Sequence, residues 1–351
     1  PSVRMLVMAD LASIRPTEIK PARFSFLFMA GTLILVGYFH MATPLLVAFF
    51  SYLALTKLHF LKWGGKMLAV TLFLVLVSAV TYGLVYFINQ SVRALPEIAD
   101  KAIPSVIQWA REYQIELPFT DYDSLKEMAL DNLGSRINYL GTLAHFARGA
   151  TTQLVFVLVG GVVAVSLFLN ARMELDREKY AVRDNLYSLC CDHIARRFQV
   201  LYQSFAMVMG AQIVISAINT ILTTIFVTAV GLPYAVVVIG VTFLCGLVPV
   251  IGNLVSNTVI VGIGFTVSPQ MALSALAFLV IIHKLEYFLN SKIIGRRIRN
   301  PLWLTLLALV LGERLMGVAG MILAPVVLNY IRMEASCVEV KHPLDPPAAK
   351  V

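Results

Sequence analysis

Eight runs of apolar residues constrain this chain more than any other feature of its sequence. They lie at about residues 24–39, 44–56, 67–88, 151–170, 206–230, 233–267, 271–290 and 302–331. Roughly 20 apolar residues let a helix cross a bilayer, and these runs lack the polar–apolar alternation that marks barrel strands. Only 14% of the residues are charged, against about 25% in soluble domains. The sequence therefore predicts an all-α, polytopic membrane protein with about eight transmembrane segments.

The composition and the motifs exclude several other classes of protein. The formal net charge is +8, but the basic residues gather in short loops between apolar runs, which is typical of membrane topology rather than of nucleic-acid binding. The four cysteines form no CxxC pair, so neither a zinc site nor a disulfide framework is indicated. His283 and Glu286 supply fewer ligands than the three of a catalytic zinc site, and GIGF at 262–265 lacks the third glycine of a dinucleotide loop. We expect no enzyme activity, no catalytic residue, no cofactor and no metal site.

The basic loops also predict an orientation in the membrane. Segments 57–66 and 291–300 contain Lys and Arg but no acidic residue, and residues 1–23 contain four basic residues and two acidic ones. Such segments stay in the cytoplasm, so we expect the N-terminus there. Segment 90–150 has six basic and eight acidic residues, which suits the outer side. Five crossings then bring the chain to the outer side before the run 233–267, which must cross an even number of times.

Two of the apolar runs are too long for one straight helix. A helix of about 30 residues is about 45 Å long, whereas the hydrocarbon core is about 30 Å thick. The run 233–267 is predicted to be a re-entrant hairpin or two short spans, because proline removes a helical hydrogen bond and glycine permits a turn. Its break points are Gly246, Pro249 and Gly252. The run 302–331 is predicted to be either one tilted helix or a hairpin that turns near Gly312–Arg314.

The runs divide the chain into four regions. These are N-terminal transmembrane helices at 1–89, an outer-face helical module at 90–150, a C-terminal transmembrane transport region at 151–331 and a cytoplasmic or flexible tail at 332–351. The outer module contains Ser124 and Glu127 at the spacing of a capping box, which marks the start of a helix. The transport region includes an amphipathic cytoplasmic helix at 171–205, whose apolar residues recur at helical spacing. Interrupted or re-entrant helices are thus expected in the C-terminal half.

Polar residues inside apolar runs are the strongest indication of function, because a charge at the centre of a membrane helix costs about 2.5–3.5 kcal/mol. The candidates for a substrate or ion pathway are Gln212, Asn253, Asn257, Glu286, Asn290, Glu313 and Arg314. Adjacent residues on a helix point about 100° apart, so Glu313 and Arg314 each need another partner. We expect this pair to face the turn at 246–257 across a transport site.

Each candidate also has a purely structural interpretation. Glu286 lies near one end of its run, where it can pair with a loop arginine at the membrane interface. Glu313 and Arg314 can form a buried ion pair that holds helices together. The amides of Gln212 and Asn219 can join helices by hydrogen bonds, and the glycines of the last runs suit close helix packing. The sequence leaves these alternatives open.

Two segments resemble the autoinducer-2 exporter family of membrane proteins. They are LEYFLNSKIIGRRIRNPLWLTLLALVLGERLMGVAGMILAPVVLNYI at 285–331 and GLPYAVVVIGVTFLCGLVPVIGN at 231–253. The first contains the family's Gly-Glu pair, here Gly312 and Glu313, and its later Ala-Pro. The resemblance implies a bacterial inner-membrane protein with about eight spans and secondary transport coupled to an ion gradient. Asn253 follows the Pro-x-Ile-Gly break, where the family generally has a polar residue or proline, and the substrate stays open.

Three functions follow from these observations and from the resemblance. The first is export of a small polar metabolite, autoinducer-2-like by resemblance, coupled to a proton or cation gradient through Glu286 and Glu313 with Arg314 as counter-ion. The second is sodium/proton antiport without an organic substrate, since the family contains such antiporters. The third is a non-transporting sensor or scaffold that binds a ligand at the outer module. The expected partners are the lipid bilayer, the solute, a proton or sodium ion and further copies of the chain, but no nucleic acid.

Overall fold

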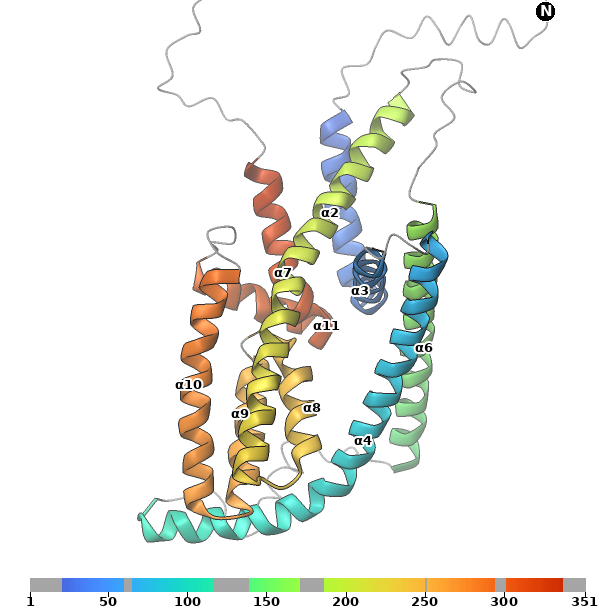
Figure 1. Cartoon of the computed structure of the whole chain (residues 1–351). Coiled ribbons are helices and arrows are strands. Elements are labelled where there is room, and N and C mark those ends of the chain that lie inside the picture. The colour runs from blue at the N-terminus through green and yellow to red at the C-terminus, as the bar shows by residue number, and fades with distance from the viewer. Residues whose placement is uncertain are drawn as a thin grey trace, which may run out of the picture.

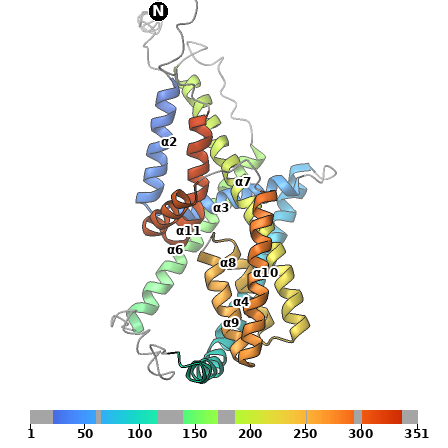
Figure 2. The same cartoon turned by 90° about the vertical axis from the view of Figure 1, so that its left-hand side faces the viewer.

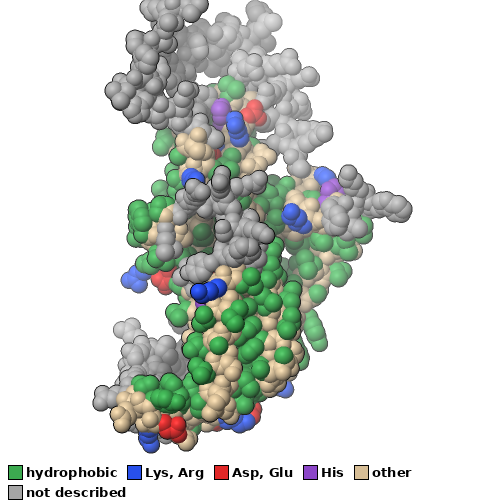
Figure 3. Space-filling model, turned by 60° about the vertical axis from the view of Figure 1, so that its left-hand side comes forward, with side chains coloured by type: hydrophobic (Ala, Val, Ile, Leu, Met, Phe, Trp, Pro, Cys, Tyr) green, Lys and Arg blue, Asp and Glu red, His purple; other side chains and the backbone are tan. Residues whose placement is uncertain are grey.

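The computed structural model describes the backbone of residues 21–59, 65–115, 139–170, 186–249, 251–293 and 301–336. Every regular element in these ranges is an α-helix (Figure 1), which confirms the predicted fold class. Five helices are long and apolar enough to cross a membrane, or six if α2 (Pro21–Tyr38) and α3 (Ala42–Leu58), bent by 116°, form one broken span. Only 11% to 28% of the residues in the apolar windows of those five helices are buried. Figure 3 shows a broad apolar surface over the helices, as expected of a multi-pass membrane protein in lipid.

The longest central element is α7 (Leu186–Val230), which joins two cores. With 45 residues it is about 67 Å long. One core surrounds the buried Phe205 and combines side chains of α2, α3, α7 and α11 (Leu302–Ser336). The other surrounds Val238 and combines side chains of α4, α7, α8, α9 and α10. The predicted amphipathic helix and the span after it are therefore one continuous helix from residue 186 onward, and residues 171–185 lie outside the described part of the chain.

The helix α4 (Gly65–Glu112) contains both the apolar run 67–88 and the first part of the predicted outer module. Pro96 and Pro104 lie inside it, and each proline removes a helical hydrogen bond and favours a bend. Figures 1 and 2 show the C-terminal half of α4 turning to run across the lower end of the bundle. There the Trp109 ring contacts the Phe265 ring, with centroids 5.9 Å apart. The predicted capping box of the module falls outside the described residues.

The helices α3 and α6 (Tyr139–Leu169) pack closely beside α4. A Cβ on Gly160 of α6 would lie 2.7 Å from the Pro44 carbonyl oxygen, so glycine permits this approach. The buried Leu55, Phe73 and Phe168 form a third core between the three helices. This side of the molecule supports the bundle but contributes no residue to the cavity described below.

The long run 233–267 is a helical hairpin of α8 (Ala235–Gly246) and α9 (Ile251–Phe265). The two arms have 12 and 15 residues, so they are about 18 and 22 Å long and shorter than the hydrocarbon core. Figure 1 shows α7, α8 and α9 meeting at the lower end of the bundle, from which α10 (Pro269–Ile293) runs back up. The chain thus enters and returns on one side, which is the re-entrant alternative and gives the even number of crossings.

The last run is also a hairpin, but it turns at Met316 and Gly317 and not at the predicted Gly312–Arg314. Within α11, Met316 (φ −142°, ψ 15°) and Gly317 (φ 60°, ψ −145°) leave the helical conformation. The two arms then fold together, because a Cβ on Gly312 would lie 2.5 Å from the Gly320 carbonyl oxygen. A positive φ suits glycine, so Gly317 forms the turn while Gly312 allows the arms to approach.

Candidate transport site

A polar cavity lies where α7, α8, α9 and α10 meet. Its lining residues are Asn219, Thr223, Thr242, Asn253, Ser256, Asn257, Ile260, Leu279, Ile282, His283 and Glu286. Eight of these eleven side chains carry a polar atom, although the surrounding helices are apolar. The space open to the centre of a water-sized sphere is about 20 Å³, and about 10–15 Å³ suffices for one water molecule. In this conformation the cavity therefore has room for a water molecule or an ion.

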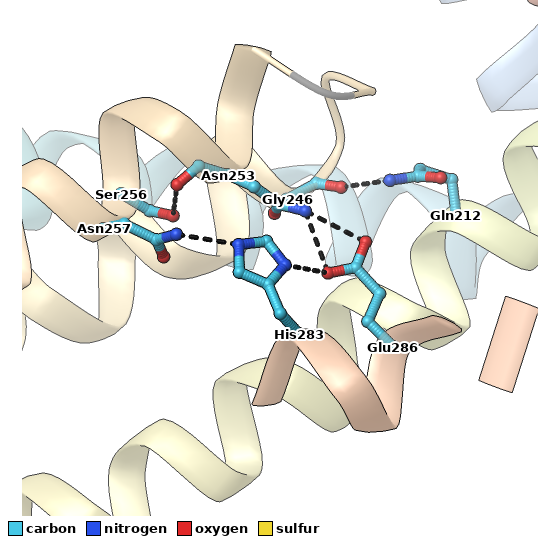
Figure 4. A network of polar contacts seen from close by, with 7 residues as sticks. All are labelled: Gln212, Gly246, Asn253, Ser256, Asn257, His283 and Glu286. Carbon is cyan, nitrogen blue, oxygen red and sulfur yellow. Dashed lines mark hydrogen bonds and ion pairs between the residues drawn. The ribbon is translucent and has the colours of Figure 1, made fainter. Parts of the chain in front are cut away.

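Glu286 is the charged centre of this cavity. The amide nitrogen of Asn253 lies 2.9 Å from both carboxylate oxygens of Glu286 and donates to them, as Figure 4 shows. The amide nitrogen of Asn257 lies 2.9 Å from His283 Nε2, and His283 Nδ1 lies 3.6 Å from Glu286 Oε2. With the imidazole proton on Nδ1, the chain of contacts runs from Asn257 through His283 to the carboxylate. Two amides of α9 and two ionisable groups of α10 thus form one connected network.

The two ionisable side chains differ in exposure. The side chain of Glu286 is 14% exposed, whereas that of His283 is 41% exposed. A carboxylate removed from water needs charged or hydrogen-bonding partners, and Asn253 supplies neutral donors rather than a permanent positive charge. Binding of a proton or a cation would compensate this charge. Among the described residues no group of three or more His, Cys, Asp or Glu side chains could hold a metal ion.

A polar stripe on α7 closes the cavity from the opposite side. Its members are Gln212, Ser216, Asn219 and Thr223, at positions i, i+4, i+7 and i+11, which lie on one helix face. Gln212 Nε2 donates to the Gly246 carbonyl at 2.6 Å, and Ser216 Oγ donates to the Phe243 carbonyl at 2.8 Å. The last carbonyls of a helix have no partner within it, so these two side chains cap the C-terminal end of α8. Asn219 and Thr223, farther along the stripe, line the cavity.

The tip of the hairpin is built by the predicted break residues. Gly246 ends α8, Pro249 lies in the turn and Gly252 lies in the first turn of α9. A Cβ on Gly246 would lie 2.5 Å from Ser216 Oγ, and one on Gly252 would lie 1.7 Å from the Cys245 carbonyl oxygen. Gly252 therefore permits the tight reversal between the two arms, whereas Gly246 permits the hairpin tip to approach α7 closely. The reversal places Asn253 opposite α10.

The structure brings some of the predicted site residues together and separates others. Asn253, Asn257 and Glu286 share the cavity. Gln212 lies beside the cavity but does not line it, because its side chain binds the end of α8. Asn290 lies near the end of α10, and its side chain is outside the described part of the structure.

Glu313 and Arg314 do not face the turn at 246–257, contrary to the expectation from sequence. Both are exposed, and neither lines the cavity. The physical reason is the packing of Gly312 against Gly320. Because that glycine faces the second arm of α11, the next two residues are turned about 100° and 200° away from it. The wall opposite the hairpin tip is formed by α10 and α7.

Sequence reasoning missed several of the lining residues. The sequence favours a helix-joining role for Asn219 and offers His283 as an incomplete zinc ligand. Thr223, Thr242 and Ser256 gave no signal, since a hydroxyl in a membrane helix usually bonds its own backbone. The available signal was the spacing of the α7 stripe, which repeats polar residues on one face of an otherwise apolar helix.

These features define a multi-pass membrane protein with a polar site between interrupted helices, the architecture of a membrane transporter. Comparison with protein families agrees with this class. The model of the AI-2E family transporter matches residues 24–333, so the chain belongs to the AI-2E family of transporters. The resemblance to the autoinducer-2 exporters is thereby confirmed.

One curated relative carries a transport name. It is "Putative transport protein YdbI" of Bacillus subtilis (strain 168), which is 28% identical over 123 residues. The match covers 34% of this chain and 35% of that protein. Since it spans only about a third of the relative's length, the relative supports the class of protein and not a particular substrate.

Proposed function

We propose that this protein is a secondary transporter that exports a small polar solute and couples that movement to a proton or cation at Glu286. The observation that carries the proposal is the position of the Glu286 carboxylate. It lies in a polar cavity inside an apolar helix bundle and is bound by Asn253 at the tip of a re-entrant hairpin. An ionisable side chain inside a membrane-embedded helix bundle carries a free-energy cost, and such residues mark substrate or ion pathways.

The geometry suggests how binding would be linked to movement. Two of the three hydrogen bonds from the hairpin to α10 in this network end on the carboxylate of Glu286, and the third joins Asn257 to His283. Protonation of Glu286 weakens its attraction for the Asn253 amide, because charge-assisted hydrogen bonds are roughly twice as strong as neutral ones. The hairpin would then be free to shift against α10 and open the cavity to the other side. Alternating access around a fixed central site is the usual mechanism of secondary transporters.

The proposed location and solute are inferred from loop charge and family membership rather than from the geometry of the site. The family resemblance supports a bacterial inner membrane, and the basic loops support an N-terminus in the cytoplasm. The family supports a solute of the autoinducer-2 type, a small polar molecule for which the cavity would have to widen. We also propose self-association, because exposed apolar helix faces with small residues such as Gly161 suit contacts between copies of the chain.

Transport into vesicles tests the role of Glu286. Purified protein is reconstituted into proteoliposomes, and solute uptake is measured with and without an imposed pH gradient. Glu286→Gln keeps the size of the side chain and removes its charge, so we expect gradient-driven uptake to fall to the level of protein-free vesicles. Glu313→Gln is the matched control and should transport like the unchanged protein. Gradient-driven uptake by Glu286→Gln at the unchanged rate would refute the assignment.

A second candidate is sodium/proton antiport without an organic solute. The observation that favours it is the small volume of the cavity, about 20 Å³. A cavity of this size suits an ion better than an organic molecule. The two candidates predict different results in vesicles with no solute present. Proton movement on addition of sodium, reported by a pH-sensitive dye, is expected for the antiporter and not for the exporter.

A further inference from the structure

Asn219 has a polar atom that no protein group satisfies. It lies on α7 and is 6% exposed, and its side-chain oxygen Oδ1 is buried without a hydrogen-bond partner in the described structure. The residue lines the cavity that also contains Glu286. A buried acceptor without a partner is unfavourable, so an unpaired amide oxygen at a cavity points to a ligand that it binds.

Four other polar groups of the cavity direct hydrogen atoms to protein partners. The amide nitrogens of Asn253 and Asn257 face Glu286 and His283. Thr242 Oγ1 donates to the Val238 carbonyl at 2.8 Å, and Ser256 Oγ donates to the Asn253 carbonyl at 3.2 Å. These two hydroxyls can therefore offer a ligand only the lone pairs of their oxygen atoms, as the Asn219 side-chain oxygen does. A cavity rich in acceptors selects a ligand that brings positive charge.

We propose that Asn219 Oδ1, with the hydroxyls of Thr242 and Ser256, binds a dehydrated monovalent cation beside the Glu286 carboxylate. Oxygen ligands suit hard cations. One carboxylate balances one positive charge, whereas a divalent ion would leave an excess charge inside an apolar bundle. The space inside the cavity matches one water-sized particle. This inference rests on the proposed role of Glu286 and extends it by naming the ligand and its neutral ligating groups.

The bound cation joins three parts of the bundle. Asn219 belongs to α7, Thr242 and Ser256 belong to the two arms of the hairpin, and Glu286 belongs to α10. Gln212 and Ser216 already fix the hairpin tip to α7. The cation adds a second link between the hairpin and α7, farther along α7 at Asn219. Occupancy therefore stabilises the conformation seen here, and release loosens the hairpin from α7 and α10.

Cation-dependent thermal unfolding of the purified full chain in detergent tests the site without any transport measurement. NaCl replaces choline chloride at constant ionic strength, and the rise in melting temperature gives the half-saturating sodium concentration. We expect Asn219→Ala to raise that concentration about tenfold or more, since the ion loses one oxygen ligand, an interaction comparable in strength to a hydrogen bond with a charged group. Asn219→Asp, which keeps an oxygen at the same position, should bind sodium at least as well as the unchanged protein.

The control and the contrary outcomes are separate from those of the transport test. Asn329→Ala removes a buried asparagine of α11, 1% exposed, that lies outside the cavity, and it should leave half-saturation unchanged. Thr242→Val, which keeps the shape of the side chain, gives a second reading if Asn219→Ala does not fold. Equal half-saturation in the unchanged protein and these cavity variants, or no sodium-specific stabilisation, would mean that the cavity holds only ordered water. Loss of gradient-driven uptake in Glu286→Gln alongside that result would leave the proposed function intact and overturn the cation site alone.

Discussion

Gly252→Ala should disrupt the hairpin that builds the candidate site. A Cβ at this position would lie 1.7 Å from the Cys245 carbonyl oxygen and 2.6 Å from its carbon atom. Non-bonded carbon and oxygen atoms need at least about 3.2 Å, so the two arms would have to separate by more than an ångström. Overpacking a close contact costs about 1–3 kcal/mol. Here the obstacle is backbone, which cannot swing aside as a side chain would, and we expect the upper end of that range.

The neighbouring Gly262→Ala provides the matched control. It lies in the same helix, and a Cβ there would have no atom within 4 Å. In a helix interior alanine is favoured over glycine by about 1 kcal/mol, so this variant should be as stable as the unchanged protein or more so. Thermal unfolding in detergent measures both, and uptake into proteoliposomes reports the site. Equal stability and equal uptake in the two variants would show that the tight reversal at Gly252 is not part of the folded protein.

Two further predictions concern contacts far from the cavity. Arg197 and Glu334 form a nearly buried ion pair, with side chains 9% and 14% exposed, and Arg197 also donates to Ser25 at 2.8 Å. Glu334→Gln leaves that arginine charge without its carboxylate, so chemical unfolding should show a loss of about 3 kcal/mol, and a much smaller loss would mean that water reaches the pair. Gly317→Ala places a Cβ at φ 60° and ψ −145°, close to a region that only glycine readily adopts, at a cost of about 1–3 kcal/mol. Gly37→Ala in α2, with open space around it, should not lower the melting temperature.

The sequence predicted those features that follow from length and from break residues. The run 233–267 is too long for one span and contains two glycines and a proline around residue 249, so a reversal there could be expected without a structure. The reversal then places Asn253 and Asn257 on the face that meets Glu286, because each lies a short distance beyond the turn.

The second hairpin shows where such reasoning stops. Gly312 and Gly317 offer the same local freedom, and both lie near the middle of their run. Which of them forms the turn depends on the fit between the two arms, where Gly312 meets Gly320 and Ala324. That contact exists only after the arms have packed. The orientation of Glu313 follows from it, so a charge pair with a strong sequence signal ended on the outside of the hairpin.

The sequence also could not distinguish the roles of the two amides of α7. Gln212 and Asn219 are polar residues on one face of one helix, yet Gln212 caps α8 and Asn219 faces a cavity. The difference comes from the length of α8, which ends at Gly246 and leaves its last carbonyls free opposite Gln212 and Ser216. Farther along, α7 meets the body of α8, whose carbonyls are already bonded within the helix. An amide there finds no backbone partner, and its oxygen remains available to a ligand.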